Sequence, residues 1–149
     1  MKKTLEILIY VLAILFVIDF LLPGTEITSK VSTIKQVKQN YYNAGGNSHF
    51  SYTVKTENEN FIISKEFRNK ITQGDTILIK KSMIFNEVNS YTFNNFSETF
   101  SLRLFSGLIL PLIVILIITL LKKFKQENNA LFLISKIMLI GNLIYVLLN

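Results

Sequence analysis

The sequence predicts a membrane protein of the α+β class, with three transmembrane helices and a small antiparallel β-sheet or partly open barrel between the first two. The helices are predicted by three apolar runs, at residues 5–22, 104–121 and 130–148. Each run approaches the ~20 residues that a helix needs to cross a hydrocarbon core of ~30 Å. The sheet is predicted by the polar segment between the first two runs, where apolar and polar residues alternate as in half-buried strands.

Lysines at the ends of the runs indicate the orientation. Positive residues on short loops beside membrane spans stay in the cytoplasm, whereas long translocated segments have little influence. These lysines precede the first run and fill the loop between the second and third: Lys2, Lys3, Lys122, Lys123 and Lys125. Abundant Asn, Lys and Ile suggest an AT-rich bacterial genome. We therefore expect a bacterial inner-membrane protein with a cytoplasmic N-terminus, a periplasmic or extracellular β-domain and a C-terminus outside.

The first run has an alternative interpretation as a cleaved signal peptide, because a basic start precedes an apolar stretch. Asp19 interrupts that stretch, and residues 21–25 lack a small-x-small cleavage pattern. A retained span is therefore the expectation.

Composition and capping signals divide the chain into five parts. We expect transmembrane helix 1 at 1–22, an extracytoplasmic β-rich domain at 23–95, a helix including span 2 at 96–124, a cytoplasmic loop at 125–129, and transmembrane helix 3 at 130–149. Asn95 and Glu98 have the spacing of a capping box, which predicts that the second helix starts there. Asn128 or Asn129 is expected to cap the third helix.

Within the β-rich domain, four to five strands are expected. Residues 30–42 fit either a helix or a strand, whereas Phe50, Tyr52 and Val54 alternate clearly with polar residues. The remaining segments are separated by turns at 57–60 and 72–75: a strand from Phe61, a strand at 76–80, and a short strand that includes Ile84, Phe85 and Val88.

Part of this domain resembles the extracytoplasmic domain of small uncharacterised bacterial membrane proteins, in which a short sheet lies between transmembrane helices. The resemblance rests on the residues at 52–54, on Phe61, and on the Gly-Asp turn and strand at 74–79, about a third of the chain. The chain departs from that pattern after the strand, where Ser82 and Met83 replace a frequent proline, and in its third span. The resemblance implies a fold and no activity.

Four polar residues in or beside the spans are the candidate site. Glu6, Asp19, Lys136 and Asn142 are placed there by the sequence, and such residues are usually paired, at the membrane interface or functional. We expect Asp19 to bond Asn142, with Gly141 allowing close helix approach, and Lys136 to reach Glu6. An ion or proton path through Asp19 is the alternative. Assembly contacts are favoured, because the second run offers few polar groups.

Other candidate features predict no chemistry. His49 is the sole histidine and has no neighbouring carboxylate or nucleophile in sequence, and Gly45-Gly46 is not followed by the residues of a phosphate loop. The chain has no cysteine, which excludes thiolate chemistry and Cys-based zinc sites, and the +6 net charge is explained by the flanking lysines and a mixed-charge domain surface. We expect no cofactor, no metal and no nucleic-acid partner.

The sequence therefore predicts a non-enzymatic accessory or scaffold subunit of an inner-membrane complex. Its expected partners are the lipid bilayer and either other membrane proteins or further copies of itself. Two alternatives remain open, a membrane immunity protein that neutralises a toxin and a component of a channel or transporter.

Overall fold

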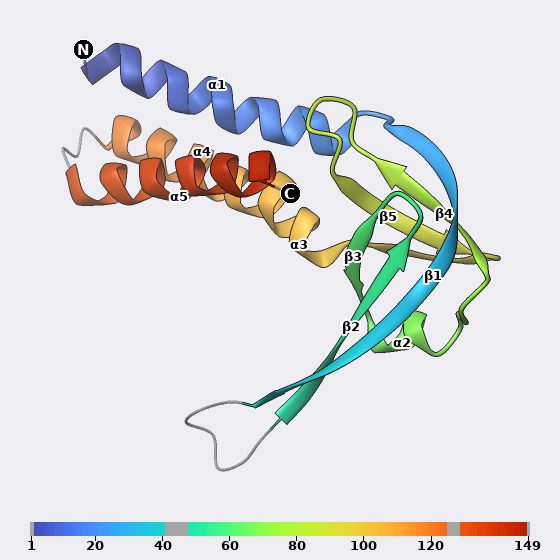
Figure 1. Cartoon of the computed structure of the whole chain (residues 1–149). Coiled ribbons are helices and arrows are strands. Elements are labelled where there is room, and N and C mark those ends of the chain that lie inside the picture. The colour runs from blue at the N-terminus through green and yellow to red at the C-terminus, as the bar shows by residue number, and fades with distance from the viewer. Residues whose placement is uncertain (1, 41–47, 125–128, 149) are drawn as a thin grey trace. The chain divides into compact units, whose positions relative to one another are not determined.

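The computed structural model describes residues 2–40, 48–124 and 129–148, which form two compact units (Figure 1). A helical unit comprises Met1–Gly24, Ser82–Glu87 and Ser101–Asn149, and a sheet unit comprises Thr25–Lys81 and Val88–Phe100. The predicted α+β class is confirmed.

The helical unit contains α1 (Lys2–Leu21), α3 (Ser101–Leu104), a π-helical turn η1 (Phe105–Ile109), α4 (Leu110–Lys123) and α5 (Asn129–Leu148). The segments α3, η1 and α4 are continuous. In the described part of the chain, three helices are long and apolar enough to span a membrane: Thr4–Leu21, Ser101–Lys123 and Ala130–Leu148. Asn129 begins α5, and Asn128 lies outside the described residues.

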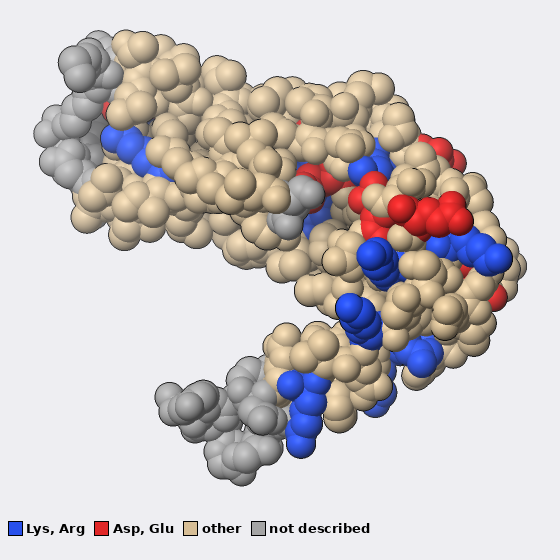
Figure 2. All heavy atoms as spheres, in the orientation of Figure 1, with Lys and Arg blue, Asp and Glu red and all other residues tan. Residues whose placement is uncertain are grey.

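The helical unit has buried apolar side chains where its helices pack and exposed apolar side chains on its outer surface. Ala13, Phe16, Val114 and Leu139 are fully buried where the helices pack, and Phe85 stacks on Phe16 with ring centroids 4.9 Å apart. Large apolar side chains also lie exposed along the helices, among them Ile7, Val11, Leu116, Ile137, Ile144 and Leu147. Figure 2 shows long helical surfaces without Lys, Arg, Asp or Glu.

The sheet unit is a curled antiparallel sheet of six strands in the order β3-β2-β1-β4-β5-β6. Its elements are β1 (Thr25–Asn40), β2 (Ser48–Thr56), β3 (Asn60–Ile63), the short helix α2 (Lys65–Arg68), β4 (Thr76–Lys81), β5 (Val88–Phe93) and β6 (Phe96–Thr99). The long strand β1 pairs with β4 through Thr25–Lys30 and with β2 from Val31 onward, and a register shift follows Val31. The ambiguous segment 30–42 is thus a strand as far as Asn40.

Alternation decides which side chains reach the core of the sheet. Val54 of β2 and Ile77 and Ile79 of β4 are fully buried, as the period of two predicts. Phe67 joins them from α2, whose first turn is capped by Ser64, the acceptor of the Phe67 N–H at 2.9 Å. Phe50 continues the same alternation but is 48% exposed, because it lies beyond the core.

The expected helix start at Asn95 is wrong. Residues 96–99, assigned to the second helix, form β6, and Asn94 and Asn95 form the two-residue turn of a hairpin in which Phe93 pairs with Phe96. Asn94 has a φ of 52°, a left-handed conformation that asparagine tolerates well. Helix caps and hairpin turns both favour asparagine, so the capping-box spacing arose by coincidence. The helix begins at Ser101 instead.

The expected strand over Ile84, Phe85 and Val88 is also wrong in its first half. Ile84 and Phe85 lie in the loop Ser82–Glu87, which belongs to the helical unit, and β5 begins at Val88. Asn86 reverses the chain there with a φ of 58°.

Glu98 of β6 joins the two edges of the curled sheet. One carboxylate oxygen accepts the Ser64 hydroxyl, which follows β3, at 2.7 Å, and the other accepts the Tyr91 hydroxyl at 3.1 Å. Burial and the negative charge of Glu98 raise the pKa of Tyr91 above its ordinary 10.0.

The raised pKa of Tyr91 predicts a loss of stability in alkali. Above pH 10 the unfolded phenol releases its proton while the folded one retains it, so the free energy of unfolding of the sheet falls by up to about 1.4 kcal/mol per pH unit until the folded pKa is reached. Below pH 10 the Tyr91 phenol keeps its proton in both states, so its full contribution to the free energy of unfolding is present. Hydrogen exchange of the β5 amides, compared between Tyr91→Phe and the unchanged chain at each pH, should show a smaller alkaline loss of protection in the variant. Parallel losses would contradict this assignment.

Candidate functional site

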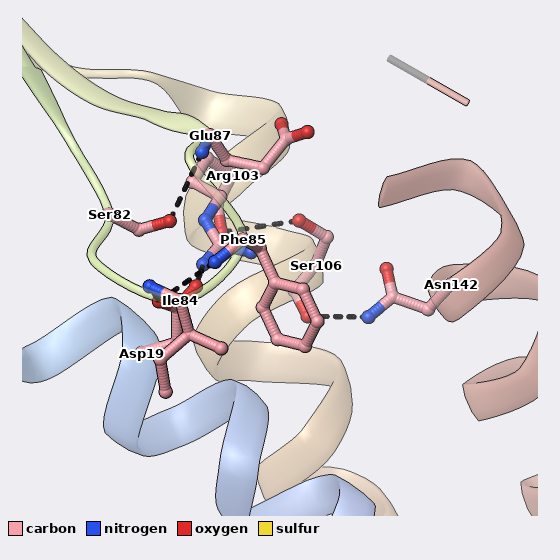
Figure 3. A network of polar contacts seen from close by, with 8 residues as sticks. All are labelled: Asp19, Ser82, Ile84, Phe85, Glu87, Arg103, Ser106 and Asn142. Atoms are coloured by element: carbon pink, nitrogen blue, oxygen red, sulfur yellow. Dashed lines mark hydrogen bonds and ion pairs between the residues drawn. The ribbon is translucent and has the colours of Figure 1, made fainter. Parts of the chain in front are cut away.

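A buried ion pair connects α1 to the start of the second long helix. The Asp19 carboxylate lies in the last turn of α1 and pairs with the Arg103 guanidinium of α3, and both side chains are fully buried (Figure 3). The same carboxylate accepts the backbone N–H groups of Ile84 at 2.6 Å and Phe85 at 3.3 Å. Asp19 therefore holds three segments that are far apart in the sequence.

The loop Ser82–Glu87 is held as a closed turn. The Ser82 N–H donates to the Glu87 carbonyl at 2.8 Å, and the Glu87 N–H donates to the Ser82 hydroxyl at 3.1 Å. Glu87 also interacts electrostatically with Arg103, which thus has two acidic neighbours. Hydrogen bonds to a charged acceptor are about twice as strong as neutral ones, which suits the Asp19 carboxylate to fixing this loop.

Asn142 supplies a hydrogen bond that Pro111 cannot make. In the π-helical turn η1, the Leu110 N–H donates to the Phe105 carbonyl five residues back. The next donor in that pattern would be residue 111, a proline without an N–H, and its acceptor would be the Ser106 carbonyl. The Asn142 side-chain amide of α5 donates to that carbonyl at 2.9 Å. A neighbouring helix thus satisfies the backbone group that proline leaves open.

Because the Asn142 amide takes the place of a backbone donor at position 111, the effects on stability of changes at Asn142 and Pro111 should be coupled. Asn142→Leu is expected to lower the free energy of unfolding in bicelles by about 0.6–1.7 kcal/mol, because the Ser106 carbonyl loses its donor. Pro111→Ala restores a backbone N–H at that position, so the same change at Asn142 should have little effect in the Pro111→Ala background. An equal loss of stability in both backgrounds would show that Asn142 does not act by replacing the missing donor of Pro111.

The other end of the helical unit has its own polar contacts. The Tyr10 hydroxyl hydrogen-bonds the Thr119 hydroxyl, and the Glu6 carboxylate lies 3.6 Å from the Lys122 ammonium. Lys136 lies over the ring of Phe132, 4.1 Å from its centroid. Lys122 and Lys123 occupy the last turn of α4, where positive charge is favourable to the helix dipole.

The structure places the four candidate residues with partners other than those expected. Asp19 and Asn142 do not bond each other, although both contact the segment α3–η1. Glu6 pairs with Lys122 in place of Lys136. The expected close approach at Gly141 is wrong, since a Cβ there would meet nothing within 4 Å.

Gly107 is the glycine that permits close approach. A Cβ at Gly107 would lie 3.0 Å from Cδ2 of Phe20 and 3.2 Å from Cζ of Arg103. The absence of a side chain therefore lets α1 and η1 come together beside the ion pair.

Arg103 is the member of the site that the sequence analysis missed. It stands one residue outside the apolar run 104–121 and is not among the expected site residues. A usable signal existed, because Arg103 is the only basic residue between Lys81 and Lys122 and Asp19 is the only acid in residues 7–22. In antiparallel helices these two charges fall at the same end.

Between the two polar ends, the packed interior of the helical unit is apolar. Phe16, Val114 and Leu139 lie there, and no chain of polar side chains links Asp19 to Tyr10 within residues 2–40, 48–124 and 129–148. Those same residues contain no cluster of three His, Cys, Asp or Glu side chains that could hold a metal. His49 lies exposed in β2, opposite Gln39. The arrangement is suited to holding helices together.

Comparison with family models, curated proteins and solved structures finds no match to this chain.

Proposed function

We propose that this chain is a non-enzymatic accessory or scaffold subunit of a bacterial inner-membrane complex. The observation that carries the proposal is the arrangement of polar groups in the helical unit: Asp19, Arg103 and Asn142 are bound in contacts between helices, while the outward side chains are apolar. Such a surface is stable in lipid, and contacts of this kind assemble helices without providing a reaction centre.

The same arrangement favours a structural role for Asp19 over an ion path. A proton-carrying carboxylate needs polar neighbours at successive depths, whereas Asp19 has an arginine and two backbone amides at one end of an apolar interior. In the proposed orientation, Lys2, Lys3, Lys122 and Lys123 lie on the cytoplasmic side and the sheet unit on the opposite side.

The sheet unit offers a surface for a protein partner, which we call the basic ribbon: residues 35–40 of β1 with residues 48–53 of β2. In its outer part, 37–40 and 48–51, the described strands pair only with each other. Val37 is 51% exposed on one face and Phe50 48% exposed on the other. Exposed apolar side chains of this kind are typical of surfaces that a partner covers.

Charge indicates what kind of partner this surface fits. From residue 30 to residue 55 the sequence has four lysines and no Asp or Glu. Figure 2 shows basic side chains along this part of the sheet unit. Lys35 and Val37 share one face of β1, so an acidic protein surface with an apolar patch would match both.

Site-specific crosslinking tests the proposal. A photoreactive residue at Val37 should form a discrete adduct with another membrane or periplasmic protein at native expression, and Lys35→Glu with Lys38→Glu should abolish it. The matched control is Ile62 of β3, which is 44% exposed but lies off the ribbon. An adduct of twice the mass of the chain would identify a homo-oligomer.

Absence of any adduct at Val37, or adducts that form equally at Ile62 and persist after charge reversal, would contradict a scaffold role for the sheet unit.

A further inference from the structure

We propose that the loop Ser82–Glu87 enters the membrane interface beside the end of α1, with the side chains of Met83 and Ile84 in contact with lipid. The inference rests on the membrane location proposed above. It adds a fourth membrane contact, made by a segment that lies between β4 and β5 in sequence and that no apolar run predicts.

Three side chains of the loop are exposed, and the two apolar ones, Met83 and Ile84, adjoin a helix that would face lipid, while the third is Asn86. Met83 is 62% exposed and Ile84 is 47% exposed. The N–H of Ile84 reaches Asp19 in α1, so these side chains lie close to the last turn of that helix, where Ile18 and Leu21 are themselves 44% and 66% exposed. The apolar surface of α1 therefore continues onto the loop.

Four backbone N–H groups of the loop have partners within the helical unit. The N–H groups of Ile84 and Phe85 donate to Asp19, that of Ser82 to the Glu87 carbonyl, and that of Glu87 to the Ser82 hydroxyl. An irregular segment can leave water only when such groups have protein partners.

The depth of the loop follows from its aromatic residue. Phe85 stacks on Phe16, which lies five residues before the end of α1. At 1.5 Å per residue this is about 7.5 Å along the helix, similar to the ~5–10 Å by which interfacial segments enter the headgroup and acyl boundary. Lipid is the occupant that these observations favour, because the surface continues that of a candidate span and Met83 and Ile84 carry no charge.

Fluorescence in proteoliposomes tests the inference, since the chain has no cysteine and accepts single labels. An environment-sensitive dye is attached to Met83→Cys, and quenching is compared for lipids carrying a nitroxide near the headgroup or deep in the acyl chains. Leu116→Cys in α4 is the deep control and Glu57→Cys in the sheet unit is the aqueous control; both positions are exposed in the protein, as is Met83.

We expect the dye at Met83 to emit at shorter wavelength than the dye at Glu57 and to be quenched best by the shallow nitroxide. A dye at Met83 that behaves as at Glu57, while Leu116 is quenched by the deep nitroxide, would overturn the loop inference alone. A dye at Met83 shielded from both water and nitroxides would indicate a protein occupant and overturn it as well. If the deep nitroxide did not quench a dye at Leu116, the membrane location itself would be overturned.

Discussion

Replacing Asp19 by alanine is expected to lower the free energy of unfolding of the helical unit by about 3–5 kcal/mol, because the change leaves Arg103 buried without its main counter-charge. It also removes the acceptor of two loop amides. The measurement is the free energy of unfolding in bicelles by steric trapping, for the full chain.

A series of variants separates the charge from the hydrogen bonds. Asp19→Asn keeps an acceptor for Ile84 and Phe85 but removes the charge, so it should be milder than alanine. Combining Asp19→Asn with Arg103→Gln removes both charges and should recover part of the loss. The exchange of Asp19 and Arg103 should not restore stability, since an arginine at position 19 cannot accept the loop amides. If the losses of stability from Asp19→Asn and Arg103→Gln were additive, the ion pair would not be the source of the loss.

Gly107→Ala is expected to destabilise the helical unit by about 1–3 kcal/mol through overpacking. The new Cβ would lie 3.0 Å from Cδ2 and 3.1 Å from Cβ of Phe20, and 3.2 Å from Cζ of Arg103. Because the methyl group meets both α1 and the ion pair, the helices must separate to admit it. The same steric-trapping measurement reports the loss.

Gly141→Ala is the matched control, since a Cβ there has open space. It should be neutral or stabilise α5 by up to about 1 kcal/mol, as alanine favours the helix over glycine. A neutral Gly107→Ala, or equal losses at the two glycines, would contradict close packing of α1 on η1.

The apolar runs and the alternating strands were predictable because each depends on local sequence. The period of two at Val54 and at Ile77 and Ile79 reports burial on one face of a strand, and the structure has those side chains in the core. The segment 30–42 was ambiguous because its alternation is weak. Pairing with β2 and β4, which no local pattern encodes, makes it a strand.

The wrong predictions arose where one residue type is favoured in two kinds of local structure. Asn94 and Asn95 fit a hairpin turn as well as a helix cap, and only the pairing of Phe93 with Phe96 decides between them. Polar partners were harder still: helix rise gives the depth of Asp19 and Asn142 in a membrane, but it does not give the rotation of their helices, which decides the partners. The donor that Asn142 supplies to Ser106 also depends on a π-turn that the sequence marks only by Pro111.

The most direct test of the membrane arrangement is the accessibility of single cysteines to a membrane-impermeant maleimide in intact cells. Glu57→Cys lies in the sheet unit, and Phe124→Cys lies just after α4 without removing a flanking lysine. We expect Glu57→Cys to be labelled in intact cells and Phe124→Cys only after permeabilisation. Labelling of Phe124→Cys in intact cells, or protection of Glu57→Cys until permeabilisation, would contradict a protein whose first two spans hold its sheet unit outside the cytoplasm.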